Sequence, residues 1–181
     1  MRYAIISDIH SNLEALTAVL NHIENNKVDK ILCLGDLIGY GPNPNECVEI
    51  VKSNCSLIIA GNHDFACIEE SEIEYFNPFA KQAIFWTIDN LSDSAYSFIS
   101  QLKLYEKVDN IYLVHASPEN PSMWNYILSI DQAILNFSCF DTQICFIGHT
   151  HVPRIFVETN DNNYFVKKES SFKIKDEERY L

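Results

Sequence analysis

The sequence lacks three features that would each point to a particular class of protein. No apolar run approaches the roughly 20 residues that span a bilayer. The N-terminus has one arginine, a very short apolar stretch and then an aspartate, which does not resemble a signal peptide. The 6 cysteines among its 181 residues form no C-x-x-C pair and are too sparse for a disulfide scaffold. We therefore expect a reduced, cytoplasmic protein without a membrane partner.

Positive charge is also scarce. The chain has 13 Lys and Arg against 25 Asp and Glu, which is a formal net charge of −12 at pH 7. Because nucleic acids and anionic membranes bind basic surfaces, neither is an expected partner. A small phosphorylated molecule stays compatible with this charge if its binding site is locally positive. With 47% hydrophobic and 21% charged residues, the composition is that of a globular domain, and no repeat or linker divides it.

Hydrophobic periodicity predicts an α/β fold. In the first third of the chain, short apolar strands alternate with helices: strands at residues 3–6, 30–34 and 56–60, and helices at 13–25 and 44–51. This order is typical of a parallel sheet covered by helices. Later residues predict helices at 79–90, 92–102 and 131–137, strands at 110–114 and 143–147, and a hairpin of 154–158 with 164–168. Ser11 and Asp131 are the expected caps of two of these helices.

Polar residues follow the ends of five apolar strands. They are Asp8 and His10; Asp36; Asn62, His63 and Asp64; His115; and His149 and His151. Asp-X-His alone is equally typical of a strand-end turn in which the aspartate caps backbone amides. In an extended backbone, however, Asp8 and His10 face the same way, and a second such pair recurs near residue 150. Since ligands bind outside the carboxyl ends of parallel strands, this repetition favours a shared site.

The chemistry of these side chains predicts metal binding. Carboxylates, an amide oxygen and imidazoles, with no thiolate, suit manganese, iron, zinc, cobalt or nickel better than a structural zinc. Seven candidate ligands exceed the needs of one tetrahedral ion, so we expect two ions that share a carboxylate and activate a water. Two divalent ions would also give an acidic protein one positive pocket for phosphate.

These strand-end motifs resemble those of a known family. Asp8-Ile-His10-Ser-Asn12, Gly35-Asp36, Gly61-Asn62-His63-Asp64, His115 and Gly148-His149-Thr-His151 resemble the five motifs of the calcineurin-like metallophosphoesterases. They occur in the order of the family and cover residues 1 to about 155. The stretch after Gly35, with its Gly-Tyr-Gly-Pro, is most similar to the small bacterial and archaeal phosphodiesterase-like branch.

The resemblance implies a four-layer αββα sandwich of two sheets flanked by helices, and two divalent ions, with manganese expected before iron, zinc, nickel or cobalt. It implies that Asp8, His10 and His151 hold one ion and that Asn62, His115 and His149 hold the other. Asp36 would bridge the ions. His63 would act as general acid or as a transition-state stabiliser, and Asp64 would orient it. Asn12 would support the metal ligands without binding an ion itself. The implied reaction is hydrolysis of a phosphomonoester or phosphodiester by a metal-bridging hydroxide.

The chain departs from the family pattern in two places. Gly39 stands where many members carry a second acidic residue, three positions after the bridging aspartate. The chain also ends soon after a charged stretch at 173–179, so we expect a single domain over 1–181 that lacks the last strand or strands usual in relatives. An open sheet edge would then be available for pairing with a second chain.

The sequence does not identify the substrate. Candidate contacts are Tyr75, Pro118, Trp124 and Tyr126, each as compatible with packing as with binding. Arg154 and Tyr40 are further candidates, for which a residue without a binding role is favoured. Two alternatives to a small-molecule phosphoesterase stay open. One is a non-catalytic interaction protein on the same fold, which would not need the complete ligand set present here. The other is a nuclease, which the acidic balance disfavours.

Overall fold

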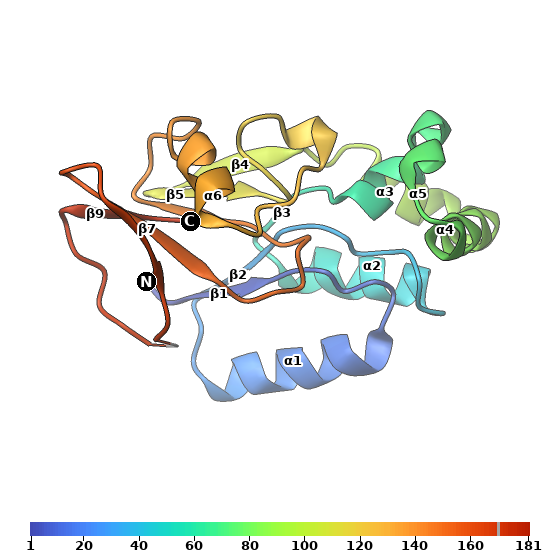
Figure 1. The fold of residues 1–181 in the computed structure, drawn as a ribbon. Coiled ribbons are helices and arrows are strands. Elements are labelled where there is room, and N and C mark those ends of the chain that lie inside the picture. Colours follow the sequence, from blue (N-terminus) through green and yellow to red (C-terminus); the bar gives the residue numbers. More distant parts are fainter. Residues whose placement is uncertain (170) are drawn as a thin grey trace. The chain divides into compact units, whose positions relative to one another are not determined.

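The computed structural model describes residues 1–169 and 171–181, and the chain divides into two compact units. The first unit is Met1–Leu104 and the second is Tyr105–Leu181. Each unit has its own β-sheet and its own hydrophobic core, and Figure 1 shows helices against both sheets. The predicted fold class, an α/β fold with two sheets flanked by helices, is confirmed.

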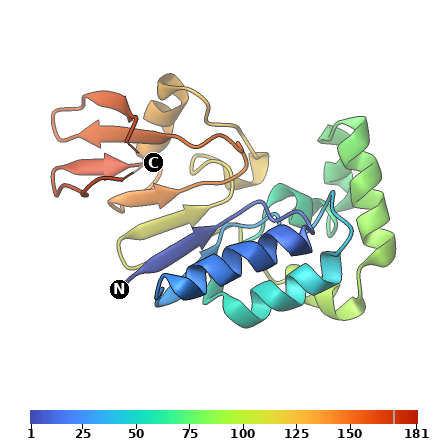
Figure 2. The same cartoon turned by 90° about the horizontal axis from the view of Figure 1, so that it is seen from below.

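The first unit is built on a parallel sheet of three strands in the order β1-β2-β3. The strands are β1 (Tyr3–Ile6), β2 (Lys30–Cys33) and β3 (Leu57–Ile58), and the connecting helices are α1 (Leu13–Asn25) and α2 (Pro44–Asn54). Because right-handed crossovers run in the same direction along the sheet, α1 and α2 lie side by side on one face (Figure 2). The predicted strands and helices are present here, although β3 is shorter than expected.

The remaining helices of this unit follow β3. They are α3 (Asn62–Ala66), the 3₁₀ helix η1 (Glu70–Tyr75), α4 (Pro78–Asn90) and α5 (Asp93–Ile99). The side chain of Asn77 caps α4, accepting the backbone N–H groups of Phe79 and Ala80 at 3.0 Å each. α5 ends three residues before the predicted boundary. The core of the unit gathers buried residues such as Leu37, Val48 and Ile84.

Two helices begin at caps other than the predicted ones. The side chain of Asn12, not Ser11, caps α1 by accepting the N–H of Ala15 at 3.0 Å. Ser11 is fully buried with φ 56°, a left-handed backbone that an N-cap does not adopt. The helix α6 (Ile130–Phe137) starts after Ser129, which forms a capping box with Gln132, and Asp131 lies inside its first turn.

The second unit contains a mixed sheet of six strands. They are β4 (Tyr105–Val108), β5 (Ile111–Val114), β6 (Ile144–Phe146), β7 (Ile155–Thr159), β8 (Tyr164–Lys167) and β9 (Glu178–Tyr180), in the order β4-β5-β6-β9-β7-β8. A short 3₁₀ helix η2 (Pro121–Met123) follows β5, and α6 packs on β7 and β8. The predicted hairpin is confirmed as β7 and β8, but β4 and β9 were not predicted from the sequence.

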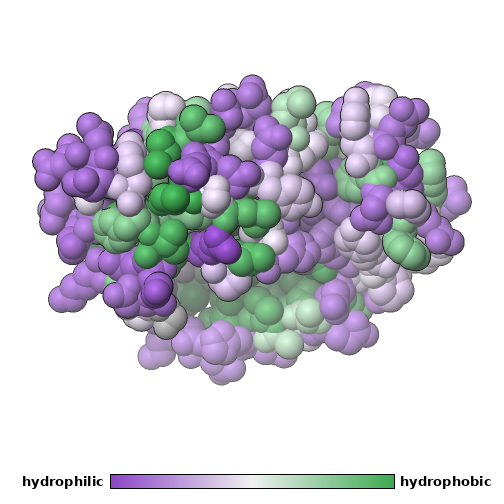
Figure 3. Space-filling view, viewed as in Figure 1, coloured by the Kyte–Doolittle hydropathy of each residue, from purple (hydrophilic) through white to green (hydrophobic). Residues whose placement is uncertain are grey.

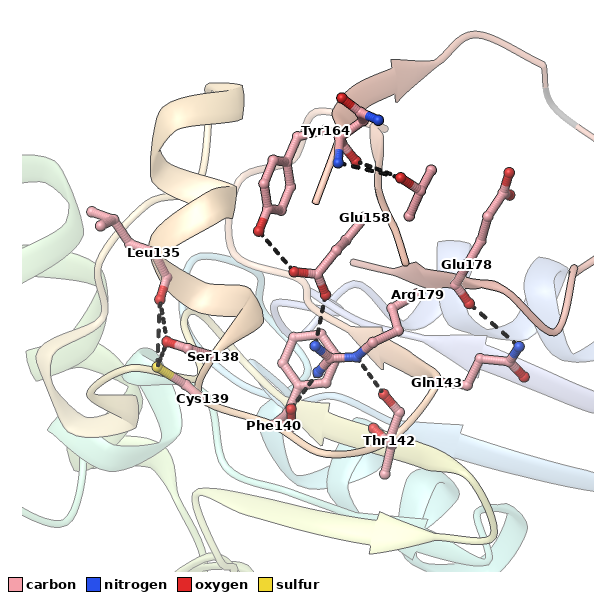
Figure 4. Close-up of polar contacts among 12 residues, drawn as sticks. Leu135, Ser138, Cys139, Phe140, Thr142, Gln143, Glu158, Tyr164, Glu178 and Arg179 are labelled. Atoms are coloured by element: carbon pink, nitrogen blue, oxygen red, sulfur yellow. Dashed lines mark hydrogen bonds and ion pairs between the residues drawn. The ribbon is translucent and has the colours of Figure 1, made fainter. Parts of the chain in front are cut away.

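Strand β9 lies inside the sheet although its sequence is charged. The guanidinium of Arg179 donates to the Glu158 carboxylate at 2.7 Å, to the carbonyl of Thr142 at 3.3 Å and to the carbonyl of Phe140 (Figure 4). It also lies 4.5 Å from the ring centre of Phe140. These contacts satisfy a half-buried charge, so a polar segment can occupy a central position.

The neighbouring Glu178 is buried and paired as well. Lys175 donates to one carboxylate oxygen at 2.7 Å and the Tyr180 hydroxyl to the other at 2.5 Å. The hydrogen bonds from Lys175 and Tyr180 lower the pKa of the Glu178 carboxyl. Both charged residues of β9 therefore form ion pairs with residues of the second unit.

Some apolar side chains remain exposed. Figure 3 shows hydrophobic side chains over α6 and β7 of the second unit. In the same unit, Leu128 is 41% exposed, Leu135 63% and Val152 45%. Exposed apolar side chains are common on protein surfaces. Among the residues that the structure describes, no helix is long and apolar enough to cross a membrane.

The contacts of Arg179 predict that this side chain stabilises the second unit. Arg179→Ala should lower the free energy of unfolding by about 2 kcal/mol, because it removes a charge-assisted network and leaves Glu158 without this partner. For a chain of this size the melting temperature should fall by about 4–8 °C. Arg179→Lys should recover only part of the loss, since an ammonium lacks the planar fork.

The matched control is Lys173→Ala, at an exposed position of the same segment, which should leave the melting temperature unchanged. Thermal unfolding followed by circular dichroism measures both variants. A melting temperature of Arg179→Ala equal to that of the wild type would contradict the stabilising role.

Candidate metal centre

The three strands of the first unit end in loops that remain hydrogen-bonded to one another. After β1 and β2, the N–H groups of Asp8, His10 and Ser11 donate to the carbonyls of Gly35, Asp36 and Leu37 at 2.9–3.1 Å. The loop after β3 leads directly into α3, which begins at Asn62. Polar side chains from separate strand ends are thereby gathered at one edge of the sheet, as parallel topology requires.

The backbone of these loops is unusual. Five of the seven predicted metal ligands have positive φ: Asp8 (56°), His10 (49°), Asp36 (53°), His149 (62°) and His151 (53°). Left-handed conformations are uncommon outside glycine, and strained backbone gathers at functional sites. The premise that Asp8 and His10 lie on an extended strand was therefore wrong, since β1 ends at Ile6. Their ligand atoms nevertheless lie within 4.8 Å of each other.

We call Asp8, His10, Asp36, Asn62 and His63 the N-terminal cluster. Ligand atoms of His10, Asp36 and His63 all lie within 4.8 Å of one another, and His10 Nε2 is 3.6 Å from Asp36 Oδ2. Asp36, Asn62 and His63 are 2%, 7% and 4% exposed. Buried or partly buried imidazoles and a carboxylate at such separations are typical of a metal site.

The His10 ring is oriented by a contact with a backbone carbonyl. Its Nδ1 lies 3.3 Å from the carbonyl oxygen of Ile38. Because a carbonyl can only accept, this contact favours a proton on Nδ1, and the ring then directs Nε2 toward Asp36. Such a backbone hydrogen bond is a common way of orienting a ligating histidine.

Two buried aspartates have different environments. Asp36 Oδ1 accepts the backbone N–H of His63 at 2.9 Å, and the loop containing Gly61 packs so closely that a Cβ at Gly61 would lie 2.1 Å from that oxygen. Asp64 accepts three backbone N–H groups, from Leu37 at 2.9 Å, Ile38 at 3.2 Å and Gly61 at 3.0 Å. Asp64 thus ties the loops together, while its expected action on the His63 ring stays a prediction.

Two predicted ligands of the second unit form a separate pair, which we call the C-terminal histidine pair. His115 is fully buried and His149 is 8% exposed, and their ring centres are 5.2 Å apart. They come from the loops after β5 and β6, which are joined by the Gly148 N–H donating to the His115 carbonyl at 2.8 Å. His151 is exposed and lies two residues beyond His149. These imidazoles suit the same metals as the N-terminal cluster.

Aromatic side chains flank both sets of residues. The Tyr126 ring stacks on His149, with centres 4.1 Å apart and planes 24° apart, and the Trp124 ring meets His115 edge-on at 6.0 Å. In the first unit Tyr40 contacts both His10 and His63. Tyr40 was a candidate contact from the sequence, but its ring contacts depend on tertiary structure.

Other candidate contacts have different surroundings. The guanidinium of Arg154 donates to the Leu128 carbonyl within the second unit, and Pro118 is buried. Tyr75 is 85% exposed on η1. Asn12 is exposed and its side chain caps α1, so its expected support of the ligands stays a prediction.

Comparison with known proteins identifies the family. The model of the calcineurin-like phosphoesterases matches residues 1–153. An uncharacterized protein of Methanocaldococcus jannaschii is 38% identical over 98% of this chain and 72% of its own length. The crystal structure of a metallophosphoesterase from Sphaerobacter thermophilus has a TM-score of 0.81 and 38% identity, over 99% of this chain and 74% of that one.

A symmetrical bis(5'-nucleosyl)-tetraphosphatase of Coxiella burnetii is 31% identical over 70% of this chain. The match spans only 44% of that relative's length. With its buried oxygen and nitrogen donors at the strand ends and a family match over residues 1–153, this chain belongs to the calcineurin-like phosphoesterase family.

Proposed function

We propose that this protein hydrolyses a small phosphate ester with two divalent metal ions as cofactors. The family implies a phosphoester hydrolase, and the observation that supports the metal dependence is the N-terminal cluster. There His10 Nε2 lies 3.6 Å from Asp36 Oδ2, and a ligand atom of His63 lies within 4.8 Å of ligand atoms of both residues. Such an arrangement of buried donors would be costly without a cation to neutralise it.

The proposed ligand roles follow the family motifs. One ion is assigned to Asp8, His10 and His151, the other to Asn62, His115 and His149, and Asp36 is assigned to both. The burial of Asp36, and the backbone N–H that it accepts from His63, support a carboxylate held in one orientation.

When bound, the two ions supply Lewis acidity that activates water and neutralises charge on the phosphate. His63 is proposed to donate a proton to the leaving oxygen as the ester P–O bond breaks and the water oxygen bonds to phosphorus. The proton lost by the water restores His63, so an ester and water become a phosphate and an alcohol, and a polyphosphate cleaved at a P–O–P bond gives two phosphorylated products. The backbone of His63 is fixed by its N–H bond to Asp36.

For the substrate we propose a molecule with an aromatic group, such as a nucleoside polyphosphate. Tyr126 is stacked on His149 yet 53% exposed, so its ring offers a surface for a nucleobase beside a proposed ligand. The name of the Coxiella relative points to the same chemistry. A nucleic-acid polymer is disfavoured by the net charge of −12.

The first experiment measures metal content and hydrolysis together. Purified protein reconstituted in turn with manganese, nickel, cobalt or zinc should bind about two ions per chain and hydrolyse nitrophenyl mono- or diesters only when loaded. His63→Ala should keep the ions but lose about 10²–10⁴-fold in kcat, the usual contribution of a general acid. Asp36→Asn should weaken both ions together.

The control is His22→Ala, an exposed histidine on α1, which should keep both ions and full activity. Two ions without turnover on any ester would favour the non-catalytic interaction protein. Absence of bound metal would refute the ligand assignment, and loss of one ion alone in Asp36→Asn would refute the bridging role.

A second prediction concerns Tyr126. Tyr126→Ala should raise KM for diadenosine tetraphosphate by about 5- to 150-fold, because stacking on a base contributes about 1–3 kcal/mol. Tyr126→Phe should keep the wild-type KM, and so should Tyr105→Ala, whose side chain is similarly exposed at 51% on β4.

Steady-state kinetics on diadenosine tetraphosphate and on glycerol 2-phosphate, which has no ring, separate stacking from general damage. An equal rise of KM for both substrates would exclude base stacking at Tyr126.

A further inference from the structure

The loop after Asp36 makes a tight turn at Gly39. This residue has φ +89°, and the N–H of Gly41 donates to the Gly39 carbonyl at 2.8 Å and to the His10 carbonyl at 3.0 Å. A Cβ at Gly39 would lie 2.5 Å from His63 Nδ1 and 3.0 Å from His63 Cγ. Any side chain at this position would occupy space that the His63 imidazole uses, which explains why a glycine, not an acidic residue, stands here.

The next residue, Tyr40, is placed over the same imidazole. Its ring centre lies 4.6 Å from that of His63 and 4.9 Å from that of His10. Tyr40 has φ 59° and is 50% exposed. A large side chain in a left-handed backbone is unfavourable, and such conformations persist where the surrounding structure determines them. Burial alone does not account for this one, since half of the side chain faces solvent.

The His63 imidazole is therefore enclosed by four groups of the first unit. Besides Gly39 and Tyr40, the ring of His10 meets it edge-on at 4.7 Å and the ring of Phe76 at 4.9 Å. His63 itself is 4% exposed. Three rings and a glycine leave the imidazole little freedom to change rotamer, and among the three rings Tyr40 is the most exposed.

We propose that Tyr40 is a positioning residue for His63, and that Gly39 provides the space the imidazole occupies. This inference rests on the proposed function, in which His63 gives a proton to the leaving oxygen. Proton transfer needs the donor within hydrogen-bond reach of that oxygen, and a displacement of about 1 Å can cost about 100-fold in rate. Tyr40 thus acts through His63, and its aromatic ring, not its hydroxyl, carries the effect.

The kinetic test uses two esters of the same type with different leaving groups, nitrophenol and phenol, on metal-loaded protein. Tyr40→Ala should lower kcat for the phenyl ester by about 10- to 100-fold and for the nitrophenyl ester much less, because the poorer leaving group depends more on the proton. KM should change little. Tyr40→Phe should keep wild-type rates, and Gly39→Ala should reproduce the selective loss.

Two comparisons make this test specific to His63. The double variant Tyr40→Ala/His63→Ala should be no slower than His63→Ala alone, because both changes remove one function. The matched control is Tyr96→Ala, a tyrosine on α5 that is 46% exposed, and its rates should equal those of the wild type. Equal losses on both esters, or additive losses in the double variant, would overturn the proposal.

An NMR measurement on metal-free protein tests positioning without activity. Nuclear Overhauser contacts between the rings of His63 and Phe76 should be present in the wild type and in Tyr40→Phe and weakened in Tyr40→Ala. Unchanged contacts in Tyr40→Ala would overturn the positioning role. If the loaded wild type hydrolyses neither ester, the proposed function fails, and the ring contacts alone then decide whether Tyr40 positions His63.

Discussion

The carboxylate of Asp64 is the interaction on which the N-terminal cluster depends. It is fully buried, and it accepts N–H groups from Leu37, Ile38 and Gly61, which belong to the loops after β2 and β3. A buried carboxylate is costly unless its lone pairs are used, and three charge-assisted hydrogen bonds offset that cost. Because one side chain joins both loops, it sets the distance between Asp36 and His63.

The cost of this arrangement lies in the backbone. Left-handed conformations at residues such as Asp8, His10 and Asp36 each cost on the order of 1–3 kcal/mol, and they are retained at the edge where the donors gather. Close approach at Gly61, where no Cβ would fit beside Asp36, allows the loops to meet. Tight packing therefore holds the donors in place, and it compensates the strain in their backbone.

Sequence patterns failed where tertiary contacts compensate a local preference. β9 carries Glu178 and Arg179, and nothing in its composition indicates a central strand. It occupies that position because Arg179 finds a partner distant in sequence, Glu158, while Lys175 and Tyr180 of the same segment pair with Glu178. The predicted cap of α1 was one residue too early, because Ser11 belongs to the strand-end loop. The predicted cap of α6 was two residues too late, because Ser129 forms a capping box with Gln132.

The sequence by itself determined the parallel βαβαβ order of the first unit and the donor types that follow each strand. Both are local properties, since apolar periodicity predicts the strands and the residue after a strand end must lie at the edge of the sheet. It also identified the family, because five spaced motifs are specific together. Only the tertiary structure decided the orientation of the His10 ring, the hydrogen bonds of Asp64 and the enclosure of His63 by Gly39 and Tyr40. These depend on distances between loops far apart in the chain, which periodicity and spacing do not contain.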